Sequence, residues 1–284
     1  MHDDVCIIIP TLDPSRVVAL VHALHAAGWH DCVIVHPGAS LSLGDARSIA
    51  TGATVSPAAA RNRGARESTK PYLCFIDDDV VLHPDVLLIL VDRCMQAGIV
   101  AVGPLLADAS SDGYWRRCMH RVMAGAQFSG HPIQSPVALM SMLLMVRREA
   151  FWSMGGFDER YQSPAGEDTA LTMRLAGIGG ICIARSVSIH HNPDPDGFWP
   201  ATRRLWRYGI AWGRVVAQSN RPSQRVRRLP LVLRMGMLPA VPFLALYDAC
   251  TSSTWEYWLG YAWLRSWWYF GWMITPVPER GIQC

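Results

Sequence analysis

The sequence predicts an α/β fold with a mostly parallel sheet, followed by a C-terminal helical extension rich in Trp and Arg. Short apolar runs of strand length alternate with segments of helical periodicity through residues 5–191. Many of these segments end at Pro, Gly or acidic residues, which terminate regular structure. Half of the 284 residues are hydrophobic and 17% are charged, which suits a buried core and excludes an intrinsically disordered chain.

The elements follow one another in a βαβ order. We expect strands at 5–10, 31–35, 72–76 and 99–102, and helices at 14–27, 57–67, 84–98 and 169–175. An apolar run at 139–146 is followed by a short helix, and 178–191 is a β-rich stretch. The first strand is a β-branched run that ends at Pro10, and the first helix ends before Gly28. Ligands of such sheets bind at the carboxyl ends of the strands, so residues that follow a strand are the candidates for function.

The composition changes near residue 196, where the turn-rich stretch 192–197 favours a boundary between domains 1–196 and 197–284. The first segment carries 15 Lys and Arg against 20 acidic residues, whereas the second carries 11 Arg against 3 acidic residues. The overall net charge is only +3 and no nucleic-acid-binding motif is present, so we expect no nucleic acid partner.

Three adjacent carboxylates, Asp77, Asp78 and Asp79, follow the expected strand 72–76. They repel one another, and burying them is costly unless a cation lies beside them. Alternation along an extended segment directs Asp77 and Asp79 to one side, an arrangement that suits Mg²⁺ or Mn²⁺ on a substrate phosphate. The alternative interpretation is a solvated acidic loop.

Two further pairs carry ionisable groups. Glu167 and Asp168 begin an expected helix, so they either cap that helix or supply a general base. His190 and His191 end the strand 178–191 and are candidate metal ligands, although such histidines are often structural.

The order of these motifs resembles that of family-2 glycosyltransferases with the GT-A fold. The resemblance covers residues 5–191 and extends to mycofactocin-type and envelope-polysaccharide glycosyltransferases. It rests on Ile7-Ile8-Ile9-Pro10-Thr11, Ala60-Arg61-Asn62-Arg63-Gly64, Asp77-Asp78-Asp79, Gly155-Gly156-Phe157-Asp158-Glu159, Glu167-Asp168 and Ser188-Ile189-His190. In addition, Arg204-Leu205-Trp206-Arg207-Tyr208 looks like the Q-x-x-R-W element of polysaccharide-building relatives, with Arg in place of Gln.

The resemblance implies roles for individual residues. Asp168 would be the general base, with Glu167 beside it. Asp77 and Asp79 would bind a divalent metal, Mn²⁺ or Mg²⁺, with His190 as a further ligand and His191 as the second choice. The donor, a nucleotide-diphosphate sugar, would be bound by Pro10, Thr11, Arg61, Asn62, Asp77, Asp78 and Arg207.

One departure from the family pattern concerns the nucleotide base. After the second strand these relatives usually have Asp-Asp-Gly-Ser, whereas this chain has His36-Pro37-Gly38-Ala39-Ser40. The identity of the nucleotide therefore stays open between uridine, thymidine and guanosine.

The C-terminal extension predicts attachment to a membrane surface. Residues 257–277 are apolar apart from Arg265 and rich in Trp and Tyr, which favour the headgroup region. The alternative is that these aromatic residues cover the catalytic domain or form a dimer interface. The eight cysteines are scattered without a Cys-x-x-Cys pair, and residues 1–4 do not resemble a signal peptide. We therefore expect a cytoplasmic protein, peripheral on the inner face of the cytoplasmic membrane.

Together these features predict an inverting glycosyltransferase that moves a sugar to a hydroxyl of a lipid-linked or cell-envelope glycan. One alternative is a tailoring glycosyltransferase for a small-molecule or peptide natural product. An alternative from another class is a catalytically silent nucleotide-binding scaffold.

Overall fold

The chain divides into two compact units. The first comprises Met1–Ala107 and Ala126–Pro193, and the second comprises Asp108–Gly125 and Asp194–Cys284. The structure is a computed structural model, and it describes residues 1–38, 45–107, 113–124, 127, 138–162, 165–191, 197–218, 231–251 and 255–275. The sequence analysis placed Asp108–Gly125 in the domain 1–196, whereas the structure groups these residues with the second unit. The reason is α4 (Tyr114–Ala124), whose apolar side chains Cys118, Met119 and Val122 pack with the core of the second unit.

The first unit is built on a mixed sheet with the strand order β3-β2-β1-β4-β7-β6-β8-β5. The strands are β1 (Val5–Pro10), β2 (Cys32–His36), β3 (Arg47–Ala50), β4 (Tyr72–Ile76), β5 (Val80–Val81), β6 (Ile99–Leu106), β7 (Leu143–Arg147) and β8 (Gly180–His191). The pairs β1–β2, β1–β4, β2–β3 and β6–β8 are parallel. The α/β fold expected from the sequence is therefore confirmed.

Strand β7 departs from the parallel arrangement, because it runs antiparallel to both of its neighbours, β4 and β6. Its first residue, Leu143, is in register with Ile76, the last residue of β4. The segment that leads into β7 consequently lies beside the aspartates that follow β4, and the Asp77 amide donates a hydrogen bond to the Met142 carbonyl at 2.9 Å.

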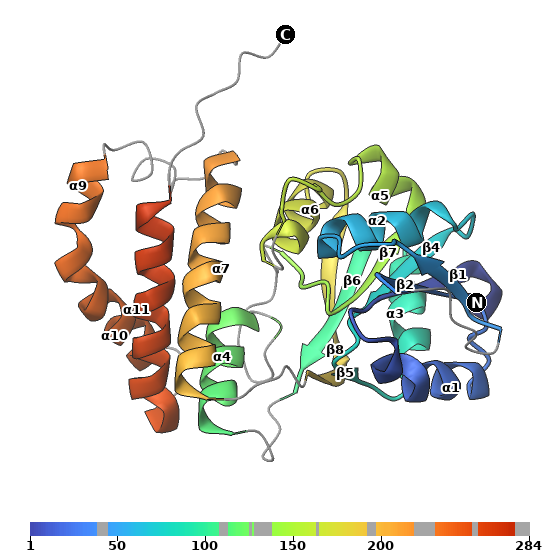
Figure 1. The fold of residues 1–284 in the computed structure, drawn as a ribbon, viewed down its shortest axis with the longest axis horizontal. Helices are drawn as coiled ribbons and strands as arrows, with labels where there is room; N and C mark the ends of the chain where they lie inside the picture. The colour runs from blue at the N-terminus through green and yellow to red at the C-terminus, as the bar shows by residue number, and fades with distance from the viewer. Residues whose placement is uncertain are drawn as a thin grey trace, which may run out of the picture. The chain divides into compact units, whose positions relative to one another are not determined.

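Helices cover both faces of this sheet (Figure 1). They are α1 (Val18–Ala26), α2 (Pro57–Arg66), α3 (Asp85–Met95), α5 (Arg148–Ser153) and α6 (Glu167–Leu175). Helix α2 begins as its sequence predicts: Ser56 precedes Pro57 and its hydroxyl accepts a hydrogen bond from the Ala59 amide at 3.2 Å. This cap fixes the start of the helix that carries Arg61 and Asn62.

An aromatic cluster anchors the core under the carboxyl end of β4. The ring of Phe75 lies 5.3 Å from that of Phe151 and 5.0 Å from that of Phe157, between ring centroids. All three side chains are fully buried. The cluster joins β4, α5 and the turn after α5, so the residues that precede Asp77 sit in a rigid environment.

The second unit is helical. It contains α4, α7 (Phe198–Gln218), α9 (Leu231–Gly236), a 3₁₀ turn η4 (Leu238–Ala240), α10 (Val241–Thr251) and α11 (Trp258–Ile274). Helix α11 packs against α7, α10 and α4 (Figure 1). The segment 257–277, which the sequence analysis assigned to a membrane surface, thus has much of its described length inside the bundle, with Tyr261, Leu264 and Met273 buried.

Helices α7 and α11 approach each other closely through two glycines. A Cβ atom at Gly209 would lie 2.0 Å from the Trp268 carbonyl oxygen, and one at Gly271 would lie 2.4 Å from the Trp206 carbonyl oxygen. Backbone atoms cannot move aside as the end of a flexible side chain can, so these positions require glycine.

We predict that Gly209→Ala destabilises the second unit by about 2 kcal/mol or more, because the helices must separate to admit a methyl group. Tryptophan fluorescence during urea unfolding measures the effect, since ten of the twelve tryptophans belong to this unit. Gly236→Ala is the matched control, because a Cβ atom there meets nothing within 4 Å. Equal stability of the two variants would contradict the prediction.

Candidate functional site

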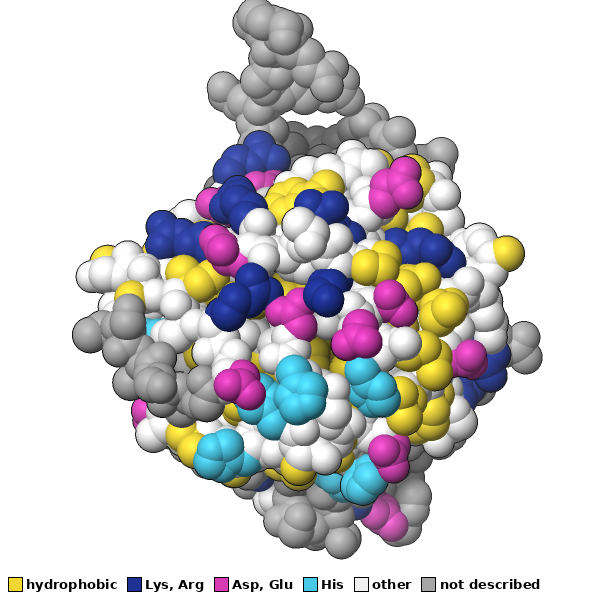
Figure 2. Space-filling view, turned by 90° about the vertical axis from the view of Figure 1, so that its right-hand side faces the viewer, with side chains coloured by type: hydrophobic (Ala, Val, Ile, Leu, Met, Phe, Trp, Pro, Cys, Tyr) yellow, Lys and Arg dark blue, Asp and Glu magenta, His cyan; other side chains and the backbone are white. Residues whose placement is uncertain are grey.

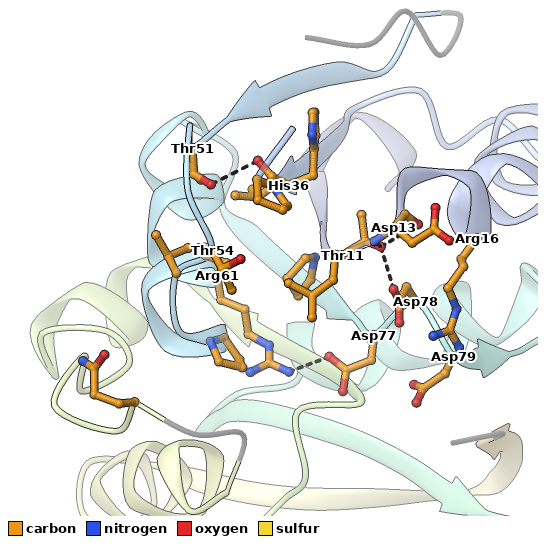
Figure 3. A pocket seen from close by; sticks show the side chains of 18 residues that line it. Thr11, Asp13, Arg16, His36, Thr51, Thr54, Arg61, Asp77, Asp78 and Asp79 are labelled. Atoms are coloured by element: carbon orange, nitrogen blue, oxygen red, sulfur yellow. Dashed lines mark hydrogen bonds and ion pairs between the residues drawn. The ribbon is translucent and has the colours of Figure 1, made fainter. Parts of the chain in front are cut away.

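A cavity of about 370 Å³ opens at the carboxyl ends of β1, β2 and β4. Six residues that the sequence analysis assigned to the site line it, namely Pro10, Thr11, Arg61, Asp77, Asp78 and Asp79. Figure 3 shows the three aspartates toward one end of the cavity and His36 and Thr51 toward the other. The cavity thus has an acidic end and a second end where apolar side chains such as Val35 and Val55 contribute to the lining.

The buried guanidinium of Arg61 holds the acidic end together. Its two terminal nitrogens donate to Asp77 Oδ1 at 2.5 Å and to Glu167 Oε1 at 3.0 Å. The Arg61 side chain is only 4% exposed and its guanidinium carbon lies 5.4 Å from the centre of the Phe157 ring. Helix α2 therefore ties β4 to the start of α6 through one cation.

The carboxylates around Arg61 outnumber it, and their pKa values reflect this imbalance. Burial raises the pKa of Asp77, in spite of the nearby Arg61 charge. Burial and the charge of Asp168 raise the pKa of Glu167 to about 7, and Glu167 Oε2 is buried with no hydrogen-bond partner among the described residues. Burial acts to lower the pKa of Arg61, but the charges of Asp77 and Glu167 outweigh burial and raise that pKa above its usual value. Arg61 therefore remains charged.

Asp78 is held by a residue from the first strand's loop. Thr11 Oγ1 donates to Asp78 Oδ2 at 2.6 Å (Figure 3). Burial raises the pKa of Asp78, although the Thr11 hydroxyl acts in the opposite direction. The contact brings the loops after β1 and β4 together at the acidic end of the cavity.

Asp79 lies beside His191, at 3.3 Å between Oδ2 and Nε2. Strand β5 pairs with the end of β8, with Val80 opposite His191, and this pairing brings the two residues together. Burial works to raise the pKa of Asp79, but the hydrogen bond and charge of His191 leave that pKa below its usual value. His190, the first choice of the sequence analysis, is exposed, so the geometry favours the second choice, His191.

Asp168 differs from Glu167 in its exposure. It is half-buried, and its Oδ2 and Oδ1 atoms accept hydrogen bonds from the amides of Ser141 at 3.2 Å and Thr169 at 2.6 Å. Glu167 is buried and paired with Arg61. Of these two carboxylates, only that of Asp168 is exposed enough to contact a molecule from solvent.

Asn62, the residue after Arg61 on α2, is buried. It does not line the cavity, and its side chain clamps the backbone of Phe157, donating to the carbonyl at 2.8 Å and accepting from the amide at 2.9 Å. Its Nδ2 also donates to Glu159 at 2.9 Å. Asn62 thus orients the turn whose Phe157 ring lies against Arg61, and its expected contact with a donor stays a prediction.

Arg207 lies on α7 in the second unit, and its side chain is exposed. Its contact with a donor diphosphate stays a prediction.

The structure adds cavity residues that the sequence did not identify. Arg16 approaches the acidic end, and its charge favours the ionised forms of Asp78 and Asp79. Three further polar residues also line the cavity, namely Thr51, Thr54 and Gln162. His36 is buried and its Nε2 lies 2.8 Å from Ser48 Oγ. The position of Arg16, six residues beyond the end of the first strand, was the available signal.

The acidic end fits a divalent cation. Asp79 Oδ1 is buried and has no hydrogen-bond partner in the described part of the chain. Carboxylates and an imidazole are suitable ligands for Mn²⁺, and carboxylates alone for Mg²⁺. No three His, Cys, Asp or Glu side chains among the described residues form a complete metal site. Substrate phosphates and water would therefore supply the remaining ligands, as is usual for such cations.

Comparisons with known proteins agree with this architecture, and the fold is that of glycosyltransferases. One such structure is a mannosyltransferase from Pyrobaculum calidifontis in complex with GDP-Man and Mn²⁺, with a TM-score of 0.60 at 14% identity over 93% of this chain and 85% of that chain. Another is S. aureus TarS residues 1–349, with a TM-score of 0.54 at 10% identity over 94% and 92% of the two chains.

The family model for glycosyltransferase-like family 2 matches residues 42–192, just over half of the chain. The chain therefore belongs to glycosyltransferase family 2.

Two curated relatives share about a third of their aligned residues with this chain. The O-antigen biosynthesis protein RfbC of Myxococcus xanthus is 30% identical over 156 residues, which is 47% of this chain and 12% of that protein. The N-acetylglucosaminyl-diphospho-decaprenol L-rhamnosyltransferase of Mycobacterium tuberculosis is 31% identical over 196 residues, 55% of this chain and 62% of that protein. The matches thus span less than two thirds of either relative.

We predict that Glu167→Gln changes the pH dependence of stability. The raised pKa of Glu167 means that its stabilising contribution is complete below about pH 4.5 and is lost as the pH rises through about 7. Relative to the wild type, the variant should therefore gain about 1–3 kcal/mol of unfolding free energy between about pH 5 and about pH 8.

Urea unfolding at the two pH values measures this difference. Glu149→Gln, at an exposed position of α5 in the same unit, is the matched control and should show no such change. A pH-independent difference between Glu167→Gln and the wild type would refute the burial argument.

Proposed function

We propose that this protein is an inverting, metal-dependent glycosyltransferase that moves a sugar from a nucleotide-diphosphate donor to an acceptor hydroxyl. The observation that carries the proposal is the excess of carboxylates over cations at the end of β4, facing a cavity large enough for a small ligand. Such an excess is stable only beside an additional positive charge, which a dication on a diphosphate provides.

Asp77 and Asp79 would hold the metal, Mn²⁺ or Mg²⁺, with His191 beside Asp79 as the candidate histidine. The metal would supply a Lewis acid for the negative charge that develops on the leaving diphosphate. The chain's own residues prepare this site. Arg61 holds Asp77 in place from behind, and His191 keeps Asp79 ionised. Pro10, Thr11 and Asp78 would contact the nucleoside.

Asp168 would act as the general base that removes the proton of the acceptor hydroxyl. It is the half-buried member of its pair, whereas Glu167 is buried against Arg61 and so positions the start of α6. A single carboxylate base suits a direct in-line displacement, which inverts the anomeric carbon. A double displacement would need a second carboxylate as nucleophile.

We propose a lipid-linked or cell-envelope glycan as the acceptor and a peripheral position on the inner face of the cytoplasmic membrane. The names of the two relatives, one for O-antigen biosynthesis and one for transfer to a decaprenyl-diphosphate sugar, support this class of acceptor. Transfer to a water-soluble small molecule or peptide, with no dependence on lipid, would favour the tailoring alternative instead.

We predict that a sugar nucleotide stabilises the protein against heat only when Mn²⁺ or Mg²⁺ is present, and that Asp79→Ala abolishes this effect. Stabilisation by a tight ligand follows mass action, so a thermal-shift panel of UDP-, dTDP- and GDP-sugars should single out one donor. Asp92→Asn, an exposed aspartate on α3, is the control and should respond as the wild type does. Equal stabilisation with a chelator present would rule out the metal.

We predict that Asp168→Asn lowers the turnover number by about 10²–10⁴, because the amide cannot accept the acceptor proton. The donor should still bind, since this side chain lies outside the set that lines the cavity. Release of nucleoside diphosphate in the presence of acceptor measures turnover, and the thermal-shift assay measures donor binding. Unchanged turnover would remove Asp168 from the mechanism.

A further inference from the structure

The second unit exposes an apolar surface formed by α9, η4 and α10. Within Val232–Thr251 the most exposed large side chains are Val232 at 78% and Phe243 at 75%, and several more are open to solvent. These further residues are Leu233, Met235, Met237, Leu244, Leu246 and Tyr247. So many exposed large apolar side chains within one short segment mark an interaction site rather than an ordinary water-facing surface.

The two charges of this segment are directed into the protein. Arg234 is buried and donates to the carbonyls of Met273 at 2.7 Å and Thr275 at 2.9 Å. Asp248 accepts hydrogen bonds from Arg265 Nε at 3.0 Å and from the Tyr269 hydroxyl at 2.8 Å. The outward face of Val232–Thr251 therefore carries no ionised side chain.

A face of the first unit provides a contrast. There, Lys, Arg, Asp, Glu and His side chains are interspersed among the hydrophobic ones (Figure 2). A protein surface adapted to water has this mixture, which is missing from the outward face of α9–α10.

The shape of the segment favours a position along a bilayer surface. By length and composition alone, Val232–Thr251 is long and apolar enough to cross a membrane, with a mean hydropathy of 1.3. However, η4, Pro239 and Pro242 divide it into α9 and α10. With 6 and 11 residues, these helices reach roughly 9 and 16 Å, short of the ~30 Å of a hydrocarbon core.

The positive net charge of residues 197–284 favours an acidic lipid. Residues 197–284 carry 11 Arg against 3 acidic residues, and Arg203 and Arg214 are exposed on α7. A unit that combines an excess of basic residues with an apolar helical face is attracted to anionic headgroups.

We propose that the outward face of α9, η4 and α10 docks onto the surface of a membrane that contains acidic phospholipid. This inference rests on the membrane association in the proposed function and assigns it to α9–α10 in place of 257–277. It does not depend on the transfer chemistry, so the two are tested separately.

The test is flotation of the full-length protein with vesicles. The wild type should float with equimolar phosphatidylcholine and phosphatidylglycerol and less with phosphatidylcholine alone. Val232→Asp with Phe243→Asp should reduce partitioning to the anionic vesicles at least about tenfold, because two exposed apolar anchors are lost. Ile178→Asp with Met95→Asp, at exposed apolar positions of the first unit, is the matched control and should float as the wild type does.

Circular dichroism, thermal unfolding and donor-dependent stabilisation show whether the fold and the site survive. If the aspartate pair unfolds the protein, Val232→Ser with Phe243→Ser provides the same test without added charge. Absence of wild-type flotation, or equal flotation of the folded variant, overturns the proposal. So does sedimentation that reveals a vesicle-free dimer disrupted by the same substitutions, since a second copy would then cover the face.

Discussion

The buried charge of Arg61 is the interaction on which the acidic site depends. A guanidinium out of contact with water needs hydrogen-bond acceptors around it. For Arg61 these are the carboxylates of Asp77, directly after β4, and of Glu167, at the start of α6. The same contacts fix the positions of the two acidic segments relative to each other. Asn62 supports the arrangement from the next position of α2, because it orients the turn that carries Phe157 beside the guanidinium.

Much of the first unit's fold could be predicted because its strands are continuous apolar runs with clear ends. The observed bounds of β1 and β4 are those expected from the sequence, and α2 begins at its Ser-Pro cap. The direction of β7 and the short strands β3 and β5 were not predictable in this way. Their pairing is decided by tertiary neighbours, and a two-residue strand such as Val80–Val81 has no periodicity to detect.

Residues of the candidate site could be predicted where several ionisable groups are consecutive in the sequence, as in Asp77-Asp78-Asp79, which line the cavity. Prediction was less successful where the direction of a side chain depends on which face of a strand it occupies. Along β8, Ile189 and His191 are buried and His190 between them is exposed. A shift of one residue in the strand register would therefore bury His190 and expose His191. Arg16 was missed because a single arginine in the 3₁₀ turn Pro14–Val17 matches no motif, and its position shortly after β1 was the only signal in the sequence.

The pairing of β5 with β8 connects the site to the edge of the sheet. Asp79 and His191 meet because two residue pairs, Val80 with His191 and Val81 with His190, hold an edge strand in place. So short a pairing contributes little stability by itself, whereas the cation of the proposed function, shared by Asp79 and a diphosphate, would add an attraction at the same point. Donor binding and the order of this edge should therefore reinforce each other, because each stabilises the conformation that the other requires.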